Sequence, residues 1–113
     1  MTTQITDEYM QEMLSEAKTY SIMLLRRTPK LSEPGAQAII WEHGRRNFAL
    51  RLDGVMPIVC PTTDEGELAG LGIFDAEPAE VGRIMDEDPG VKAGIFTYEV
   101  YPCRGFPGSA LPD

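Results

Sequence analysis

The sequence predicts a single α+β domain with the element order strand, helix, strand, strand, helix, strand. Three observations support this prediction. Residues 22–25 are apolar at every position, which is typical of a central strand covered on both faces. Residues 35–52 carry apolar side chains at helical spacing and are followed by Gly54, which suits the left-handed end of a helix. Pro57 lies in the next apolar segment, and proline confines a strand to the edge of a sheet.

The remaining elements follow from local signals. They are an amphipathic helix at residues 4–18, strands at 20–27, 55–61, 67–75 and 93–101, and a second core helix that begins at Pro78. The segment Asp88-Pro89-Gly90 ends this second helix, because a residue before proline avoids the helical region. Each boundary therefore has a local chemical reason.

With the second strand at an edge, these elements assemble most simply into a ferredoxin-like βαββαβ sheet. Its first and third strands are central, and both core helices cover one face. The other face has no cover within the chain although the first strand is apolar on both sides, so we expect a homodimer. Cys60 and Cys103 end strands at opposite edges, and we expect no disulfide between them.

Composition restricts the classes of function. A chain of 113 residues with 42 % apolar residues suffices for one domain with its own core. The formal net charge of -8 argues against nucleic acid and anionic membrane surfaces as partners. No apolar run approaches the roughly 20 residues that span a bilayer. The first residues are polar rather than signal-like, and two cysteines are too few for a disulfide scaffold, so we expect a cytoplasmic protein.

The only histidine, His43, lies near the middle of the predicted central helix. On a helix it shares one face with four apolar residues and an asparagine: Ala36, Ile39, Ile40, Leu50 and Asn47. Two interpretations are open, a core histidine with one satisfied ring nitrogen or a buried group that carries out proton chemistry beside a cleft. Trp41, Phe48 and Leu52 form a second apolar stripe, which the N-terminal helix or another chain could cover.

Three consecutive carboxylates, at residues 86–88, stand at the C-terminal end of the second core helix, where the helix dipole disfavours negative charge. Asp88 differs from the other two because Pro89 holds its backbone in an extended conformation. Departures from a local rule often mark functional residues. The alternative is a solvated acidic helix end, since exposed charges are common and contribute little to stability.

Two segments carry a resemblance to a known family. Residues 88–96 read DPGVKAGIF and continue as TYEVYP, and residues 73–81 read IFDAEPAEV. The first segment resembles the closing motif of the YCII-related (YciI-like) domain family, and the second resembles the strand-to-helix step that precedes this motif. The resemblance covers residues 19–103, which leaves an N-terminal helical extension at 1–18 and a C-terminal arm at 104–113.

The resemblance implies a dimeric α/β barrel of ferredoxin-like subunits. Members of that family are regarded as enzymes with a histidine–aspartate pair in a cleft. Carried over to this sequence, the pair is His43 and Asp88. A carboxylate that holds one imidazole nitrogen fixes the tautomer and leaves the other nitrogen to exchange protons. We therefore expect the two side chains within hydrogen-bond reach, directly or through one water.

No other catalytic apparatus is evident. No serine or cysteine has a nucleophile signature, no metal-ligand cluster accompanies the lone histidine, and no phosphate loop or dinucleotide motif is present. These observations point to a small enzyme of lyase or isomerase type that acts on a cyclic or aromatic-derived metabolite without a metal or cofactor. The alternative is a non-catalytic small-ligand-binding or accessory domain. In either case we expect the cleft between the central helix and the loop at residues 86–90.

Further residues are candidates for substrate binding. Arg45 and Arg46 could hold an anionic group, or they could belong to a solvated helix face. Gly70 and Gly72 lie on one face of the third strand and permit close approach by a helix, a ligand or another chain. Tyr98 could line the cleft, or it could be an amphipathic core tyrosine.

Overall fold

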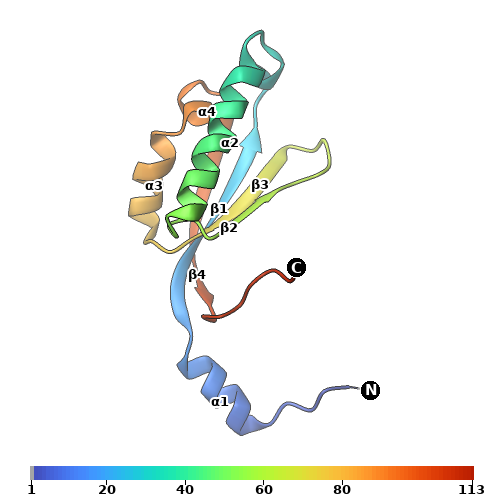
Figure 1. The fold of residues 1–113 in the computed structure, drawn as a ribbon, viewed down its shortest axis with the longest axis vertical. Helices are drawn as coiled ribbons and strands as arrows, with labels where there is room; N and C mark the ends of the chain where they lie inside the picture. The colour runs from blue at the N-terminus through green and yellow to red at the C-terminus, as the bar shows by residue number, and fades with distance from the viewer. Residues whose placement is uncertain (1) are drawn as a thin grey trace.

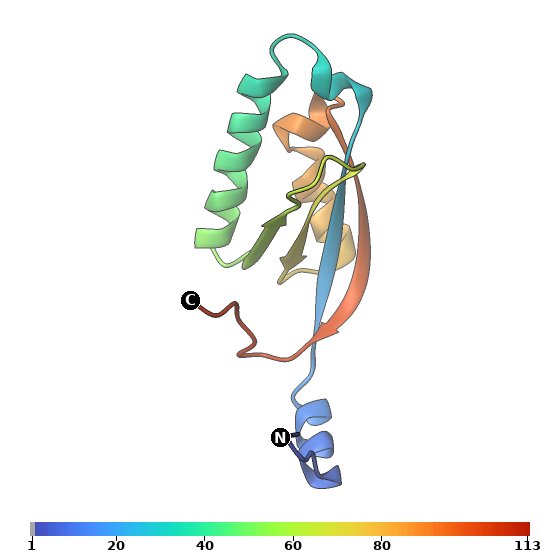
Figure 2. The same ribbon diagram turned by 90° about the vertical axis from the view of Figure 1, so that its right-hand side faces the viewer.

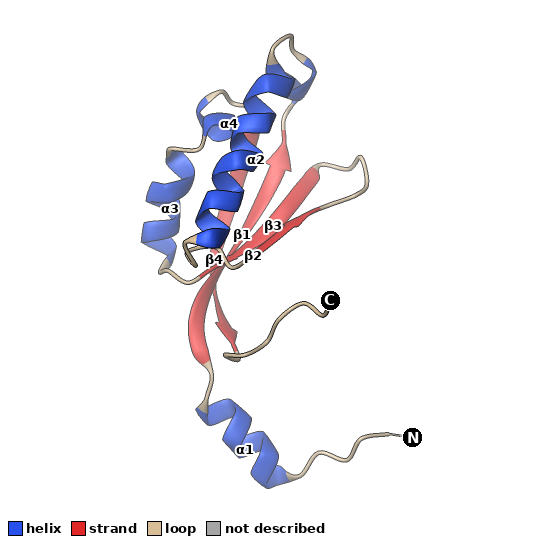
Figure 3. Cartoon of the chain, viewed as in Figure 1, coloured by secondary structure: helices blue, strands red, loops and turns tan. Residues whose placement is uncertain are grey.

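The sheet of the computed structural model, which describes residues 2–113, has four antiparallel strands in the order β2-β3-β1-β4. The strands are β1 (Lys18–Arg27), β2 (Ile58–Pro61), β3 (Leu68–Phe74) and β4 (Phe96–Gly105). The helices are α1 (Asp7–Ser15), α2 (Ala36–Leu52), α3 (Pro78–Asp86) and α4 (Pro89–Lys92), with a 3-10 turn at Pro29–Ser32. Figures 1 and 3 show α2, α3 and α4 on the same side of the sheet, which is the ferredoxin-like arrangement.

The strand order agrees with the one expected from the sequence. β1 and β3 are the central strands, and β2 lies at an edge. Pro57 directly precedes β2, so this strand begins at Ile58 rather than at residue 55. The two residues before the proline turn back toward α2 instead: the N–H groups of Val55 and Met56 both donate to the Leu50 carbonyl.

The last strand begins later and ends later than predicted. β4 continues to Gly105, where it pairs with Lys18 at the start of β1, whereas the expected range was residues 93–101. The long first strand provides backbone partners for the additional residues, so the C-terminal arm begins after Gly105. Cys60 in β2 and Cys103 in β4 occupy opposite edge strands and are free, as predicted.

A short helix, α4, follows α3 where the sequence suggested only a turn. Pro89 ends α3 as expected. The Asp88 carboxylate then accepts hydrogen bonds from the N–H groups of Gly90 and Val91 and begins a new helical turn. Gly94, with a φ of 75°, leads out of this turn into β4.

The core lies between the helices and one face of the sheet. Alternate residues of β1 and β3 point to this face, and the buried apolar residues form one cluster: Met23, Leu25, Ala36, Met56, Ala69, Phe74, Val81, Met85, Ile95 and Phe96. The opposite face carries half-buried aliphatic side chains: Ile22, Leu24, Ile58, Leu71 and Ile73. No helix within residues 2–113 covers that second face (Figure 2).

The N-terminal helix stands away from the rest of the molecule. Thr6 caps α1 by accepting a hydrogen bond from the Tyr9 N–H at 3.1 Å. The helix is shorter than the predicted residues 4–18, buries none of its own residues and projects beyond the end of the sheet (Figure 1). It does not cover the second apolar stripe of α2, whose members are exposed: Trp41, Phe48 and Leu52.

Candidate active site

His43 lies on the buried side of α2. Ala36 and His43 are the buried residues of this helix. The His43 side chain points into the core, and the residue is 7 % exposed. The imidazole packs against the Phe96 ring of β4, with 4.8 Å between the ring centroids. The helix face predicted from residue spacing is therefore the face that meets the sheet.

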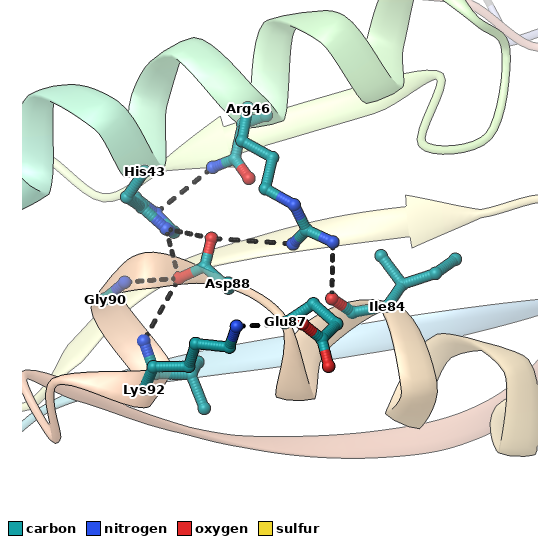
Figure 4. A network of polar contacts seen from close by, with 9 residues as sticks. His43, Arg46, Ile84, Glu87, Asp88, Gly90 and Lys92 are labelled. Atoms are coloured by element: carbon teal, nitrogen blue, oxygen red, sulfur yellow. Dashed lines mark hydrogen bonds and ion pairs between the residues drawn. The ribbon is translucent and has the colours of Figure 1, made fainter.

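Asp88 meets this imidazole from the turn between α3 and α4 (Figure 4). His43 Nδ1 lies 2.8 Å from Asp88 Oδ2 and 2.9 Å from Oδ1, which confirms the predicted hydrogen bond. The carboxylate is fully buried and also accepts the N–H groups of Gly90 at 3.0 Å and Val91 at 3.1 Å. Because the carboxylate acts as an acceptor throughout, this arrangement assigns a proton to His43 Nδ1.

Asn47 lies one helical turn after His43 and contacts the other ring nitrogen. Its Nδ2 lies 3.1 Å from His43 Nε2 and donates to it, which agrees with the proton assigned to Nδ1. Asn47 Oδ1 is buried and has no hydrogen-bond partner among the described residues. A buried acceptor of this kind is uncommon and invites a water or a ligand donor. The helical spacing placed Asn47 beside His43 without indicating this role.

Arg46 contacts the pair without lining the cavity beside it. Its Nη1 lies 3.7 Å from Asp88 Oδ1, and its Nη2 donates to the Ile84 carbonyl at 2.7 Å. Ile84 belongs to the last turn of α3, and its carbonyl also accepts the Glu87 N–H at 3.3 Å. Arg45 is exposed and pairs with Glu42 at 3.2 Å. Neither arginine is placed to meet a ligand in the cavity.

The other two carboxylates of the acidic segment have partners of their own. Asp86 accepts a hydrogen bond from the Tyr98 hydroxyl at 2.6 Å, which raises the pKa of Tyr98 to about 12. Glu87 pairs with Lys92 at 2.8 Å, and this hydrogen bond lowers the pKa of Glu87. Tyr98 therefore connects β4 to the end of α3, and it does not line the cavity.

A cavity of about 360 Å³ opens beside His43, between α2 and strands β1, β2 and β3. Most of its lining is apolar and comes from side chains that include Met23, Leu25, Leu31, Ile40, Phe48, Met56, Val59 and Phe96. Its polar side chains are His43 and Asn47 on α2, together with Arg27 at the end of β1 and Thr62 just after β2. The cavity therefore has two polar regions joined by apolar walls.

This cavity is not where the sequence placed it. We expected a cleft between α2 and residues 86–90, but none of those residues lines the cavity. The space on that side of α2 is occupied by the fully buried Asp88 side chain and by the guanidinium of Arg46. Because the carboxylate fills one side of the imidazole, the ring meets open space on its other side, toward the strands.

The two glycines of β3 differ in their relation to the cavity. Gly70 lines it, and a Cβ there would lie 2.7 Å from the Cys60 carbonyl oxygen of the neighbouring strand. Gly72 does not line it, because the Met56 side chain occupies the position that a Cβ would need. β2 therefore packs closely against Gly70, and the Met56 side chain packs closely against Gly72.

The polar cluster around His43 consists of one imidazole, one buried carboxylate, one amide and one guanidinium. Within residues 2–113, no group of three or more histidine, cysteine, aspartate or glutamate side chains is arranged to hold a metal ion. No helix in the same range is long and apolar enough to cross a membrane.

Comparison with known proteins supports the fold. No protein-family model matches the chain, and no functionally curated protein matches it. Among solved structures, the chain is similar to 5-chloro-2-hydroxyhydroquinone dehydrochlorinase from Burkholderia phenoliruptrix AC1100, determined in complex with 2,5-dihydroxybenzoquinone. The match covers 73 % of this chain and 90 % of that chain, at 20 % sequence identity and a TM-score of 0.50. This likeness supports the YciI-like, ferredoxin-like fold indicated by the sequence motifs.

Proposed function

We propose that this protein is a small enzyme that works without a cofactor and uses His43 and Asp88 for general acid–base chemistry. The reaction is of lyase or isomerase type, on a small cyclic or aromatic-derived metabolite. One observation carries this proposal: a buried carboxylate holds the Nδ1–H of a buried imidazole, and that imidazole lines a mostly apolar cavity.

The roles of the two residues follow from their positions. Asp88 holds the ring orientation and the Nδ1–H tautomer, so Nε2 is the nitrogen that accepts a proton from the ligand. The carboxylate then stabilises the positive charge of the imidazolium. The proton returns to a different atom of the ligand in an isomerisation, or to a leaving group in an elimination. The apolar walls exclude water and strengthen both electrostatic interactions.

The size of the cavity favours a single-ring compound. Its volume of about 360 Å³ is near the lower end of the range for small-molecule sites. The structurally similar dehydrochlorinase is named for a chlorinated hydroxyhydroquinone, and its ligand is 2,5-dihydroxybenzoquinone, so both compounds are single rings with oxygen substituents. Since a shared fold alone does not carry a reaction, these compounds serve only as the first to be tested.

One observation favours a second function, ligand binding without catalysis. The Asn47 amide already donates to His43 Nε2 at 3.1 Å. A nitrogen whose lone pair is hydrogen-bonded cannot accept a proton until that amide turns or moves away. If it does not move, the same cavity serves a non-catalytic ligand-binding or accessory domain.

Solvent deuterium exchange distinguishes these functions. The protein is incubated in D₂O with hydroxyhydroquinone, 2,5-dihydroxybenzoquinone or 1,3-cyclohexanedione, and loss of each ring C–H signal is followed by proton NMR. We expect accelerated exchange of at least one compound, and a decrease of about 100-fold or more in His43→Gln, the typical contribution of a positioned general base. Glu42→Gln, on the exposed side of α2, is the matched control.

Each outcome of this experiment distinguishes the enzyme from the binding domain. Exchange that requires His43 supports the enzyme. Chemical-shift changes in the amides of the cavity residues, without any accelerated exchange, support the binding domain and reject the enzyme. Equal exchange rates in the unaltered protein and in His43→Gln also reject the acid–base proposal.

A further inference from the structure

Arg27, the last residue of β1, is a polar group of the cavity that the acid–base proposal does not use. Its Nη1 donates to the backbone carbonyls of Gly66 and Leu68, and its Nη2 lies 3.4 Å from the Thr62 hydroxyl oxygen. The Thr62 hydroxyl in turn donates to the Leu68 carbonyl at 2.7 Å. The turn between β2 and β3 therefore holds the guanidinium in one orientation.

All of these partners are neutral. No carboxylate lies within ion-pair distance of Arg27 anywhere in residues 2–113, although the chain carries a formal net charge of -8. Lys30, Arg51 and Arg104 also have no acid partner among residues 2–113, but they do not line the cavity. The other cations are paired with acids: Lys18, Arg26, Arg45, Arg46, Arg83 and Lys92. Arg27 is half-buried, and among residues 2–113 its Nε–H has no hydrogen-bond partner, so its charge is available to an anion that enters the cavity.

Arg27 and His43 belong to different walls of the same cavity. His43 reaches it from α2, whereas Arg27 and Thr62 reach it from the strand side. Apolar side chains line the rest of the cavity, so a ring can lie in it with one end at each polar region.

We propose that Arg27 is the anchor for an anionic oxygen group of the ligand, such as a carboxylate, and that the protein selects small ring compounds with such a group. The inference deepens the proposed function, because it rests on the same cavity as the substrate site. The planar guanidinium matches a carboxylate through two parallel hydrogen bonds. Its fixed orientation reduces the entropy lost when the ligand binds. Arg45 and Arg46 do not have this position, since both are engaged outside the cavity.

A pair of test compounds of the same shape, one anionic and one neutral, tests the anchor. The dissociation constants of 3-hydroxybenzoate and 3-hydroxybenzamide are measured near neutral pH by amide-detected NMR titration. We expect the benzoate to bind about tenfold more tightly or better, as a charge-assisted hydrogen-bond pair provides. Arg27→Gln should abolish this preference, Arg27→Lys should keep part of it, and Arg51→Gln, which removes a cation outside the cavity, should keep all of it.

An NMR measurement on the unaltered protein tests the anchor even if a variant does not fold. The Arg27 Nε–H resonance should shift with 3-hydroxybenzoate and not with 3-hydroxybenzamide. Equal affinities for the two compounds, no binding of either, or an unchanged preference in folded Arg27→Gln would overturn the anchor. His43→Gln should retain the preference, because the anchor does not depend on proton transfer. Loss of the Arg27 effect and loss of His43-dependent exchange are therefore distinguishable failures.

Discussion

His43 is held at both ring nitrogens by groups of different chemistry. A carboxylate that is itself fixed by two backbone N–H groups accepts from Nδ1, and an amide donates to Nε2. The Asp88 side cannot exchange protons with a ligand, because Asp88 is fully buried. Proton exchange is therefore restricted to Nε2 and the cavity side of the ring.

The first residue-scale prediction concerns the buried charge of Asp88. Asp88→Asn should lower the free energy of unfolding by about 2–3 kcal/mol, because charge-assisted hydrogen bonds become neutral and the nearby guanidinium of Arg46 loses its counter-charge. Urea denaturation measures this difference. Glu87→Gln is the control, since it neutralises the preceding carboxylate in an exposed ion pair and should change stability little. Equal effects of the two substitutions would contradict the prediction.

The second residue-scale prediction concerns the buried amide oxygen. Asn47→Leu removes the donor to His43 Nε2 and also removes the Oδ1 atom that has no partner in the described structure. The two effects oppose each other, so the free energy of unfolding should change by less than about 1 kcal/mol. A much larger loss in urea denaturation would mean that a bound water satisfies Asn47 Oδ1.

At the scale of elements, side-chain hydrogen bonds add to the core packing of Val81 and Met85 in positioning the short helices α3 and α4. The Tyr98 hydroxyl connects β4 with the end of α3, and the Asp88 carboxylate starts α4. These contacts explain why an acidic segment is tolerated at a helix C-terminus: each of its carboxylates has a partner outside its own helix. Negative charge is unfavourable at the C-terminal end of α3, and the tertiary contacts of these carboxylates compensate for it.

The Tyr98 contact predicts a pH dependence of stability. The pKa of Tyr98 is raised from 10.0 to about 12 by its hydrogen bond to Asp86. Its contribution to stability is therefore fully present below the unfolded pKa and is lost as the pH rises through the folded one. Tyr98→Phe should lower the free energy of unfolding by about 1 kcal/mol at neutral pH, and the difference should disappear toward pH 12. Urea denaturation at several pH values measures it, with Tyr9→Phe in the exposed helix α1 as control.

A pair of glycines tests the close approach of β2 and β3. A Cβ at Gly70 would lie 2.7 Å from the Cys60 carbonyl oxygen and 3.0 Å from the Pro61 Cα, whereas a Cβ at Gly44 in α2 would meet nothing within 4 Å. Gly70→Ala should therefore lower the free energy of unfolding by about 1–3 kcal/mol. Gly44→Ala should raise it by up to about 1 kcal/mol, because alanine favours the helix. The opposite ranking in thermal or urea unfolding would show that the strands separate readily.

At the scale of the whole molecule, the chain is extended. Its radius of gyration is 16.7 Å, compared with about 13 Å expected for a compact domain of this length. α1 accounts for part of this extension, since it projects from the end of the sheet with Tyr9, Met10 and Leu14 exposed (Figure 1). A helix this short is marginal in water unless another surface covers it.

We propose that the protein is a homodimer in which the uncovered faces of two sheets pack together. The half-buried aliphatic residues of that face support the proposal. Sedimentation equilibrium at micromolar concentration should give twice the mass of one chain. Ile73→Lys, on the central strand β3, should give the monomer mass, whereas Leu52→Lys, on the exposed side of α2, should remain dimeric. A monomer mass for the unaltered protein would contradict the proposed homodimer.

Several features of the fold could be predicted because their causes are local. Pro57 placed β2 at an edge, since a missing N–H excludes a residue from a central ladder wherever the strand lies. The apolar run at residues 22–25 marked a central strand, and the 3.6-residue period placed His43 on the buried face of α2. The boundaries of β4 and the existence of α4 were missed, because they depend on the pairing with β1 and on the Asp88 side chain.

The sequence by itself determined the strand order, the buried face of α2 and the two residues of the His43–Asp88 pair. The signals for these features are a proline, a helical period and a family motif, and each can be recognised in a short stretch of the chain. Only the tertiary structure decided on which side of His43 the cavity opens and which arginine meets it. Those questions depend on which side chains fill the space between elements, such as Asp88 and Arg46 on one side of the ring. Arg27 lies at the cavity because of pairing between segments distant in the chain, for which no local pattern exists.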